Sequence, residues 1–275
     1  MNKIKNSRIL IAGLGLIGGS VAKALKMAGC PALYAFDDDA NTLDSAIRDG
    51  VIQKGFIKLS GKMPTFDIII CCLLPRFIVS FYEDIKLHLK PGGVFAELSG
   101  LKTNILNKLS CAAKNAHQIL SLHPMAGSEK SGYAYSDATL FNGSMLILTP
   151  TDLTKTAALC WAQYIKTVLG CSDMRELSAE LHDEIITKVS HIPHIAALAI
   201  RAMGKGIEHF AGGSYRAVTR VADINSTLWA GLMTDNREYL LNSISLFKQI
   251  IDVIEDTIKK GDEKELKKLL DEISE

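Results

Sequence analysis

The sequence has few of the features that are typical of a nucleic-acid-binding or a membrane protein. Its 275 residues carry 31 basic and 30 acidic side chains, so the formal charge of +1 gives no general attraction to phosphate backbones or anionic lipids. No apolar run approaches the roughly 18–20 residues of a membrane-spanning helix. We therefore expect neither a nucleic acid nor a membrane as a partner.

Cysteine is scarce and is not arranged for disulfides or zinc. The six cysteines include no C-x-x-C pair, and Cys71 and Cys72 lie inside the apolar segment IIICCLL. Such buried, reduced thiols are typical of a cytosolic protein. The first residues lead directly into a strand-like segment, so no cleaved signal peptide is expected. The sequence predicts a cytoplasmic protein with no metal site.

Up to about residue 150, short apolar segments alternate with segments of helical length. The expected strands are 9–12, 33–36, 66–73, 94–98, 119–122 and 145–148. The expected helices are 16–28, 76–89, 104–115 and 152–169, and a last strand is expected over 172–177. This alternation favours an α/β fold with a parallel sheet and right-handed crossovers.

After residue 177 the sequence predicts only helices and loops. Residues 178–203 have a helical pattern in which Pro193 should kink or break the helix, and 204–217 should be a loop or short helix. Apolar spacing over 236–260 predicts a long amphipathic helix, followed by a capping box, Asp262-x-x-Glu265. We expect two domains, 1–175 and an all-helical 176–275.

A glycine motif follows the first expected strand and begins the first helix. Gly13-x-Gly15-Leu16-Ile17-Gly18 matches G-x-G-x-x-G. The first glycine allows a tight turn, the second lets a pyrophosphate approach the backbone, and the third allows close packing of helix on strand. The motif and its context predict a dinucleotide-binding site of the Rossmann type.

Asp37 lies at the end of the second expected strand, about 20 residues after the motif, where an acidic side chain binds the adenosine ribose hydroxyls. Its charge should repel a 2′-phosphate, so NAD is favoured over NADP. The alternative is a glycine turn beside a solvated acidic loop. Leu73, Leu74 and Pro75 should lie near the nicotinamide, or merely end a strand.

His123 directly follows a strand-like segment and precedes Pro124. It should therefore stand at the carboxyl end of a strand, where sites of open α/β sheets gather. The loop after it, 125–132, is small and polar and could close over a ligand. The alternative is a histidine that satisfies the backbone of this loop.

Two further features lie in the helical part. Asp183, Thr187, Ser190 and His194 follow one another at spacings that keep them within an arc of roughly 60° on an α-helix, so they either line a polar site or face water. Arg220, flanked by apolar residues, could bind a substrate carboxylate with its planar fork, cap a helix or pair with Asp223.

Several segments together resemble the prephenate dehydrogenase family of tyrosine biosynthesis, which includes arogenate dehydrogenases. They are GLGLIGGS, ELSGLKT, HPMAGSEKSG, HDEIITKVSHIPH and TRVADINSTLW, and they extend over nearly the whole chain. HPMAGSEKSG together with SHIPH is highly specific, whereas the glycine loop is not.

The resemblance implies roles for particular residues. His123 would accept a hydrogen bond from the substrate's ring hydroxyl and help its proton leave. His194 would position the substrate, and Arg220 would receive a substrate carboxylate. The same resemblance assigns Ser190, Asp183 and Trp229 to the substrate site, and Glu129 to its mouth.

Two positions depart from the family pattern. Relatives often have a serine where this chain has Gly100, so assistance to His123 would be lost or would come from Ser99. Relatives also often have an acidic residue three positions before the arginine, where this chain has Ala217.

The resemblance implies NAD-dependent oxidative decarboxylation of prephenate by a homodimer formed through the C-terminal helices. Arogenate is a second candidate substrate. The sequence also leaves open a β-hydroxyacid-type dehydrogenase of the same two-domain plan and an NAD-sensing protein without turnover.

Overall fold

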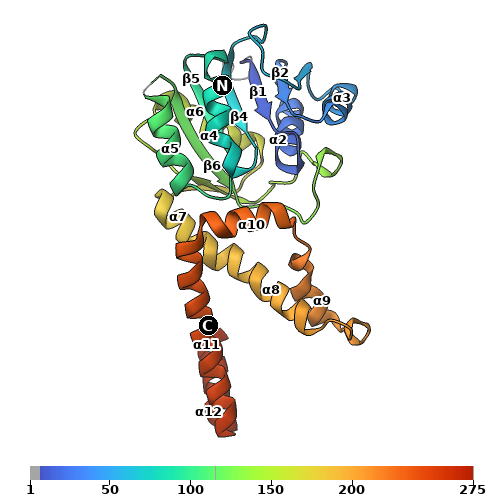
Figure 1. Cartoon of the computed structure of the whole chain (residues 1–275), viewed down its shortest axis with the longest axis vertical. Coiled ribbons are helices and arrows are strands. Elements are labelled where there is room, and N and C mark those ends of the chain that lie inside the picture. Colours follow the sequence, from blue (N-terminus) through green and yellow to red (C-terminus); the bar gives the residue numbers. More distant parts are fainter. Residues whose placement is uncertain (1–6, 115, 275) are drawn as a thin grey trace. The chain divides into compact units, whose positions relative to one another are not determined.

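The computed structural model describes residues 7–114 and 116–274, and the chain divides into two compact units (Figure 1). One unit is Met1–Asp183 with Ile224–Leu232, and the other is Glu184–Asp223 with Met233–Glu275. Within the described ranges, no helix combines the length and the apolar character that crossing a bilayer requires.

The first unit is built on a sheet of eight strands in the order β3-β2-β1-β4-β5-β6-β7-β8, counted over the described residues. The strands are β1 (Ile9–Ala12), β2 (Leu33–Phe36), β3 (Lys54–Phe56), β4 (Phe66–Cys71), β5 (Leu89–Glu97), β6 (Gln118–Pro124), β7 (Met145–Leu148) and β8 (Asp173–Glu176). The order 3-2-1-4-5-6 is that of dinucleotide-binding folds. The expected Rossmann-type architecture is confirmed, and β3 is the strand that the sequence did not predict.

The sheet is parallel, as expected, except at β7, which pairs antiparallel with β6. The described chain between these strands contains one 3-10 turn, Tyr133–Tyr135, and no crossover helix. A parallel pair needs a crossover that returns the chain to the opposite edge. Without it, β7 starts at the edge where β6 ends.

Five helices of the described residues cover this sheet (Figure 1). They are α2 (Leu16–Met27), α3 (Ala40–Arg48), α4 (Pro75–Ile85), α5 (Thr103–Ala113) and α6 (Thr156–Val168). Helix α3 was not predicted, and α6 begins after the predicted residue 152. The predicted end of α5 at Asn115 lies outside the described residues.

The remaining helices follow β8. They are α7 (Ala179–Ile186), α8 (Ile192–Met203), α9 (Gly213–Thr219), α10 (Ser226–Asp235), α11 (Arg237–Lys260) and α12 (Glu263–Ser274). A π-helical segment, Thr187–His191, joins α7 to α8 just before Pro193, which lacks a backbone N–H. Asp262 accepts hydrogen bonds from the backbone N–H groups of Lys264 and Glu265, so the predicted cap of α12 is present.

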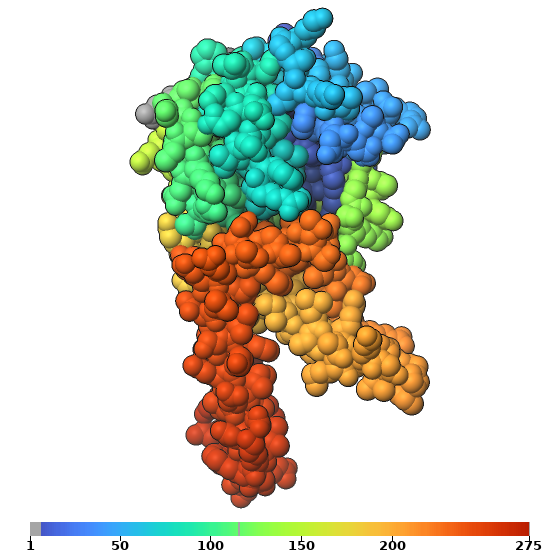
Figure 2. All heavy atoms as spheres, in the orientation of Figure 1, coloured from blue at the N-terminus to red at the C-terminus, as the bar shows by residue number. Residues whose placement is uncertain are grey.

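Helix α12 packs on α11 and runs back beside its end (Figure 1). In Figure 2 the atoms of these two helices are the red part of the helical unit. Apolar side chains of α11 remain 41–63% exposed, namely Leu241, Leu246, Ile250, Ile251, Val253 and Ile258. The amphipathic helix expected over 236–260 is therefore present, with much of its apolar surface uncovered in one chain.

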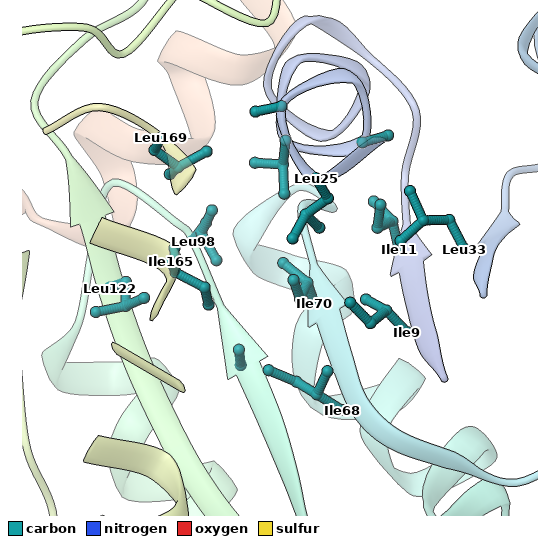
Figure 3. Close-up of a cluster of buried hydrophobic side chains, with 14 of the residues drawn as sticks. Ile9, Ile11, Leu25, Leu33, Ile68, Ile70, Leu98, Leu122, Ile165 and Leu169 are labelled. Carbon is teal, nitrogen blue, oxygen red and sulfur yellow. The ribbon is translucent and has the colours of Figure 1, made fainter. Parts of the chain in front are cut away.

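The core of the first unit lies on both faces of the sheet. Ile9 and Ile11 of β1 pack into one cluster, with Leu25, Ile68 and Ile70 among its members (Figure 3). Leu10 and Ala12 of the same strand belong to a second cluster. Because successive side chains of a strand point to opposite faces, strands covered on both sides are apolar throughout. This packing holds the carboxyl ends of β1, β4, β5 and β6 at one edge.

Candidate active site

The glycine loop after β1 has the geometry that a dinucleotide requires. Gly13 has φ of +85°, which side-chain-bearing residues rarely adopt, and a Cβ on Gly18 would lie 1.8 Å from the carbonyl oxygen of Gly13. Gly15 caps α2, and a Cβ there would meet no atom within 4 Å. The space beside Gly15 and the N-terminus of α2, which Leu16 and Ile17 begin, suit a pyrophosphate.

Asp37 directly follows β2 and faces this loop. Its Oδ2 accepts the backbone N–H of Leu14 at 2.7 Å, and its Oδ1 accepts that of Asp39 at 3.0 Å. Each carboxylate oxygen has two acceptor sites, so these bonds orient the group and leave capacity for ribose hydroxyls. The arrangement fits the group that the sequence predicts to bind here.

The segment after β4 also contacts the glycine loop. A Cβ on Gly13 would lie 3.0 Å from Cδ2 of Leu73. Leu74 caps α4, and Pro75 occupies its first turn. The structure thus brings Leu73 to the glycine loop, while Leu74 and Pro75 define the start of the next helix.

His123 is the next-to-last residue of β6 and is half-buried. Its Nδ1 lies 2.9 Å from Nε2 of His182, which precedes Asp183 on α7. Strand β6 is parallel to β5, β5 to β4, and β4 to β1, so His123 stands at the edge that carries the glycine loop. This is the position expected for it.

The chain after His123 is attached to the helix that the glycine motif begins. Lys23 Nζ donates to the carbonyl oxygen of Ser136 at 2.8 Å, and the backbone N–H of Asp137 donates to Ser20 Oγ at 2.9 Å. These bonds tie the β6–β7 connection to α2. Within the connection, Glu129 is exposed.

A buried ion pair lies beside this strand end. Lys102 Nζ is 2.7 Å from Oε1 of Glu97 and 2.8 Å from the carbonyl oxygen of Leu122, and both charged side chains are fully buried. Ser121 also donates to Glu97. Burial lowers the pKa of Lys102, although Glu97 opposes the effect. The pair joins β5 to the backbone just before His123.

Ser99 belongs to this network. Its hydroxyl hydrogen-bonds with Glu97 and with the carbonyl oxygen of Leu101, the latter at 2.7 Å, and Glu97 also accepts the Ser99 backbone N–H at 2.8 Å. The bonds described for Ser99 therefore tie it to Glu97 and Leu101, and its direct assistance to His123 stays a prediction.

Gly100 is the residue of this loop that approaches the histidine. A Cβ on Gly100 would lie 3.9 Å from Nε2 and Cε1 of His123, and equally far from Cδ2 of Leu232. Leu232 belongs to α10, one turn after the half-buried Trp229. Within the first unit, Gly100, His123 and the first turns of α10 are thus close neighbours.

Asp183, which the resemblance assigns to the substrate site, accepts hydrogen bonds from three groups of the fold. Its Oδ1 accepts from Nδ1 of His182 at 2.8 Å and from the backbone N–H of Lys102 at 2.9 Å. Its Oδ2 accepts the N–H of Thr103 at 2.8 Å. With a side chain 5% exposed, Asp183 caps α5 and holds His182.

The helical unit carries the other expected substrate residues. His194 Nδ1 lies 2.8 Å from the carbonyl oxygen of Ser190, and Thr187 Oγ1 lies 2.6 Å from Ser243 Oγ. The predicted polar stripe assumed a regular α-helix, which the π-helical segment interrupts. Arg220 is exposed, and Asp223 pairs with Arg201 at 2.8 Å.

Sequence reasoning missed His182, Glu97 and Lys102. A glutamate at the end of an otherwise buried strand, with a lysine five residues later, is a signal for a buried pair, since charges are almost never buried alone. His182 had no comparable signal. Its importance comes from a contact between β6 and α7, which are far apart in the sequence.

Comparison with known proteins agrees with this architecture. The profile of the prephenate dehydrogenase nucleotide-binding domain matches residues 21–171, and that of the prephenate dehydrogenase dimerization domain matches 178–272. The prephenate dehydrogenase of Bacillus subtilis is 28% identical over 278 residues, covering 97% of this chain and 74% of that protein.

Solved structures are similar over almost the whole chain. A prephenate dehydrogenase from Aquifex aeolicus, in complex with hydroxyphenyl propionate and NAD+, superposes with a TM-score of 0.87 at 26% identity, covering 97% of this chain and 96% of that one. An arogenate dehydrogenase from Synechocystis has a TM-score of 0.81 at 26% identity, with 97% of both chains covered. With its glycine loop, its histidine at the carboxyl end of β6 and both domain profiles matched, the chain belongs to the prephenate dehydrogenase family of oxidoreductases.

Proposed function

We propose that the protein catalyses the NAD-dependent oxidative decarboxylation of prephenate to 4-hydroxyphenylpyruvate, a step of tyrosine biosynthesis. The observation that carries the proposal is the position of His123 at the carboxyl end of β6, in the sheet whose β1 and β2 carry Gly13 and Asp37. A base and a nucleotide cradle at one edge of a sheet support a reaction that removes a proton and a hydride together.

The residues divide the reaction between them. Bound NAD supplies the acceptor for the hydride. Gly13, Gly15 and Gly18 admit its pyrophosphate, and Asp37 binds its ribose and disfavours a 2′-phosphate. His123 takes the proton of the ring hydroxyl. At the same time the hydride leaves the ring carbon that bears this hydroxyl. The electrons of the bond to the departing carboxylate enter the ring, which becomes aromatic as CO2 is released, and the resulting phenolate oxygen takes a proton back from the His123 imidazolium.

The helical residues complete the proposal by holding the substrate. Arg220 would bind a carboxylate through two parallel N–H bonds, a geometry that suits its planar guanidinium. His194 donates from Nδ1 to a backbone carbonyl when it is neutral, so its Nε2 is an acceptor for a substrate group. Ser190, Trp229 and Glu129 remain candidates for substrate contacts, and Ser99 for assistance to His123.

Prephenate and arogenate differ only in a keto or an amino group on the side chain. Relatives of both substrate classes are similar to this chain at comparable identity. We choose prephenate because a curated relative covering nearly the whole chain acts on it, as its name states. Arogenate is the second candidate.

We also propose a homodimer formed through the helical part. The exposed apolar side chains of α11 support it, as does the match of residues 178–272 to a domain described as a dimerization domain. We propose that the boundary between the nucleotide-binding domain and the helical domain lies at residue 175. Buried free thiols such as Cys71 favour a cytoplasmic location.

The test is a set of four assays that pair NAD or NADP with prephenate or arogenate, following the absorbance of the reduced cofactor. We expect turnover with NAD and prephenate, and identification of 4-hydroxyphenylpyruvate as product. Faster turnover of arogenate than of prephenate would make arogenate the substrate. Nucleotide binding without turnover of either compound, or of a β-hydroxyacid, would make the chain a nucleotide-binding protein.

A further inference from the structure

Three side chains form a continuous hydrogen-bonded row behind the proposed base. His123 Nδ1 is 2.9 Å from His182 Nε2, and His182 Nδ1 is 2.8 Å from Asp183 Oδ1. The two rings lie with centroids 5.1 Å apart and planes tilted by 56°. His182 and Asp183 are 1% and 3% exposed, whereas His123 is half-buried. Only the histidine of β6 is thus partly open to solvent.

The far end of the row is an ionised carboxylate. Burial raises the pKa of Asp183, but hydrogen bonds from His182, Thr103 and Lys102 outweigh it and hold the pKa below its ordinary value. Two of these bonds come from backbone N–H groups at the start of α5, where the helix dipole also favours an anion. At neutral pH, Asp183 therefore only accepts hydrogen bonds.

The protonation of both neutral imidazoles follows from that anion. Because Asp183 only accepts, His182 must donate from Nδ1, which leaves its Nε2 as an acceptor. His123 must then donate from Nδ1, so its basic lone pair is on Nε2. That atom lies on the side of Gly100, where a Cβ would be 3.9 Å away.

We propose that His182 and Asp183 are positioning residues that hold His123 in the tautomer with a basic Nε2 and stabilise the imidazolium formed when it takes the substrate proton. The proposal rests on the proposed function and adds to it the source of the base's orientation. The O–H bond of the ring hydroxyl breaks, and its proton bonds to Nε2 of His123. The resulting positive charge is shared through the Nδ1–H bond with His182, while Asp183 stays ionised.

The structure also explains why this support comes from α7. The side chain of Ser99 is bonded to Glu97 and Leu101, and Gly100 has no side chain, so the contacts described for the β5–α5 loop orient neither nitrogen of His123. Ser178 accepts the backbone N–H of Leu181 at 3.2 Å and so helps to start α7 just before His182. The bonds of Asp183 to the backbone N–H groups of Lys102 and Thr103 fix α7 against the start of α5, where His182 reaches His123 of β6.

The first experiment measures tautomers in the absence of substrate, by NMR of protein with ¹⁵N-labelled histidine. The His123 signals are assigned by their loss in His123→Asn. We expect a protonated Nδ1 and an unprotonated Nε2 in the native protein near neutral pH. In Asp183→Asn the amide can donate to Nδ1 of His182. This would switch both imidazoles to the other tautomer and place the His123 proton on Nε2. A native His123 protonated on Nε2 would overturn the proposal.

The second experiment measures kinetics on the same variants. Asp183→Asn should lower kcat about 10²–10⁴-fold while KM and the NAD dissociation constant stay nearly unchanged, because the loss falls in the transition state. His182→Gln keeps an acceptor for the Nδ1–H of His123, so it should lose less activity than His182→Phe. Equal losses in these two variants would reduce His182 to a packing residue.

Two controls separate this role from folding. Asp262→Asn removes a carboxylate that also accepts two N–H bonds at a helix start, and His117→Gln removes a histidine paired with Tyr82. Both should leave kcat unchanged. If Asp183→Asn does not fold, the tautomer of His123 in the native protein and the kcat values of the two His182 variants still test the positioning role. If His123 carries its proton on Nδ1 but the protein turns over neither substrate, the proposed function is wrong and the positioning role of His182 and Asp183 stands. If the protein turns over substrate but His123 carries its proton on Nε2, only the positioning role is wrong.

Discussion

The two units of the chain differ in how completely their apolar side chains are buried. In the nucleotide-binding unit, apolar side chains pack on both faces of the sheet, and even charged groups such as Glu97 and Lys102 are buried in pairs. In the helical unit, Ile250 and Ile251 of α11 remain 41% and 46% exposed. The first unit is complete in one chain, and the second is expected to be completed by another. The proposed base, His123, is half-buried in the first unit, whereas Arg220, the proposed carboxylate-binding residue, is exposed in the second.

The largest expected effect tests the completeness of the nucleotide-binding unit. Lys102→Met leaves Glu97 buried without its partner, which should lower the free energy of unfolding by about 3–5 kcal/mol. The matched control is Lys90→Met, which removes a half-exposed pair with Asp67 at 2.7 Å and should cost less than about 1 kcal/mol. Urea denaturation measures both. Similar losses in the two variants would show that burial of the pair is unimportant.

The second prediction concerns the uncovered face of the helical unit. Ile250→Lys should weaken the dimer at least about tenfold, because burial of an isoleucine side chain contributes roughly 1.5–3 kcal/mol. Ile47→Lys is the control, since Ile47 is 42% exposed on α3 in the other unit. Sedimentation equilibrium measures the dissociation constants. A native protein that is monomeric at micromolar concentration and fully active would contradict the dimer.

The third prediction tests the exposed arginine. Arg220→Lys keeps the charge but loses the two-bond geometry, so KM for the substrate should rise about tenfold with little change in kcat. Arg216→Lys, an exposed arginine of α9, should change neither constant. If both variants behave like the native protein, Arg220 has a structural role.

The smallest effect is expected at the nucleotide. Asp37→Ser should weaken NAD binding by about fivefold, as loss of hydrogen bonds to a ribose would, and should improve NADP binding. Asp38→Ser, at the exposed neighbouring position, should leave both affinities unchanged. Equal affinity of the native protein for the two nucleotides would remove the assignment of Asp37.

The sequence predicted features that depend on local patterns. Alternating apolar segments and the glycine motif indicated a dinucleotide-binding sheet, and strand position indicated the edge where His123 lies. Apolar periodicity predicted α11, and a capping box predicted α12. Each of these follows from residues close together in the chain, which is why the family resemblance and the fold agree.

Features that depend on distant contacts were not predictable in this way. The antiparallel β7 results from a connection without a crossover helix, and the π-helical segment before Pro193 breaks the spacing that placed Asp183 and His194 in one stripe. The family resemblance assigns Asp183 to the substrate site, and no local pattern shows that the start of α5 also takes its carboxylate as an acceptor. The role of His182 depends on the contact of α7 with β6, which no local sequence pattern indicates.

The central claim is that His123 accepts the proton in the hydride-transfer step. The most direct measurement is the pH dependence of kcat for the native enzyme and for His123→Asn, with NAD and substrate saturating. We expect native activity to fall with decreasing pH as His123 becomes protonated, because the protonated base cannot accept a proton. His123→Asn should lower kcat about 10²–10⁴-fold and lack this acid limb. A variant that keeps most of its kcat and the same acid limb would contradict the claim and direct the search to His194.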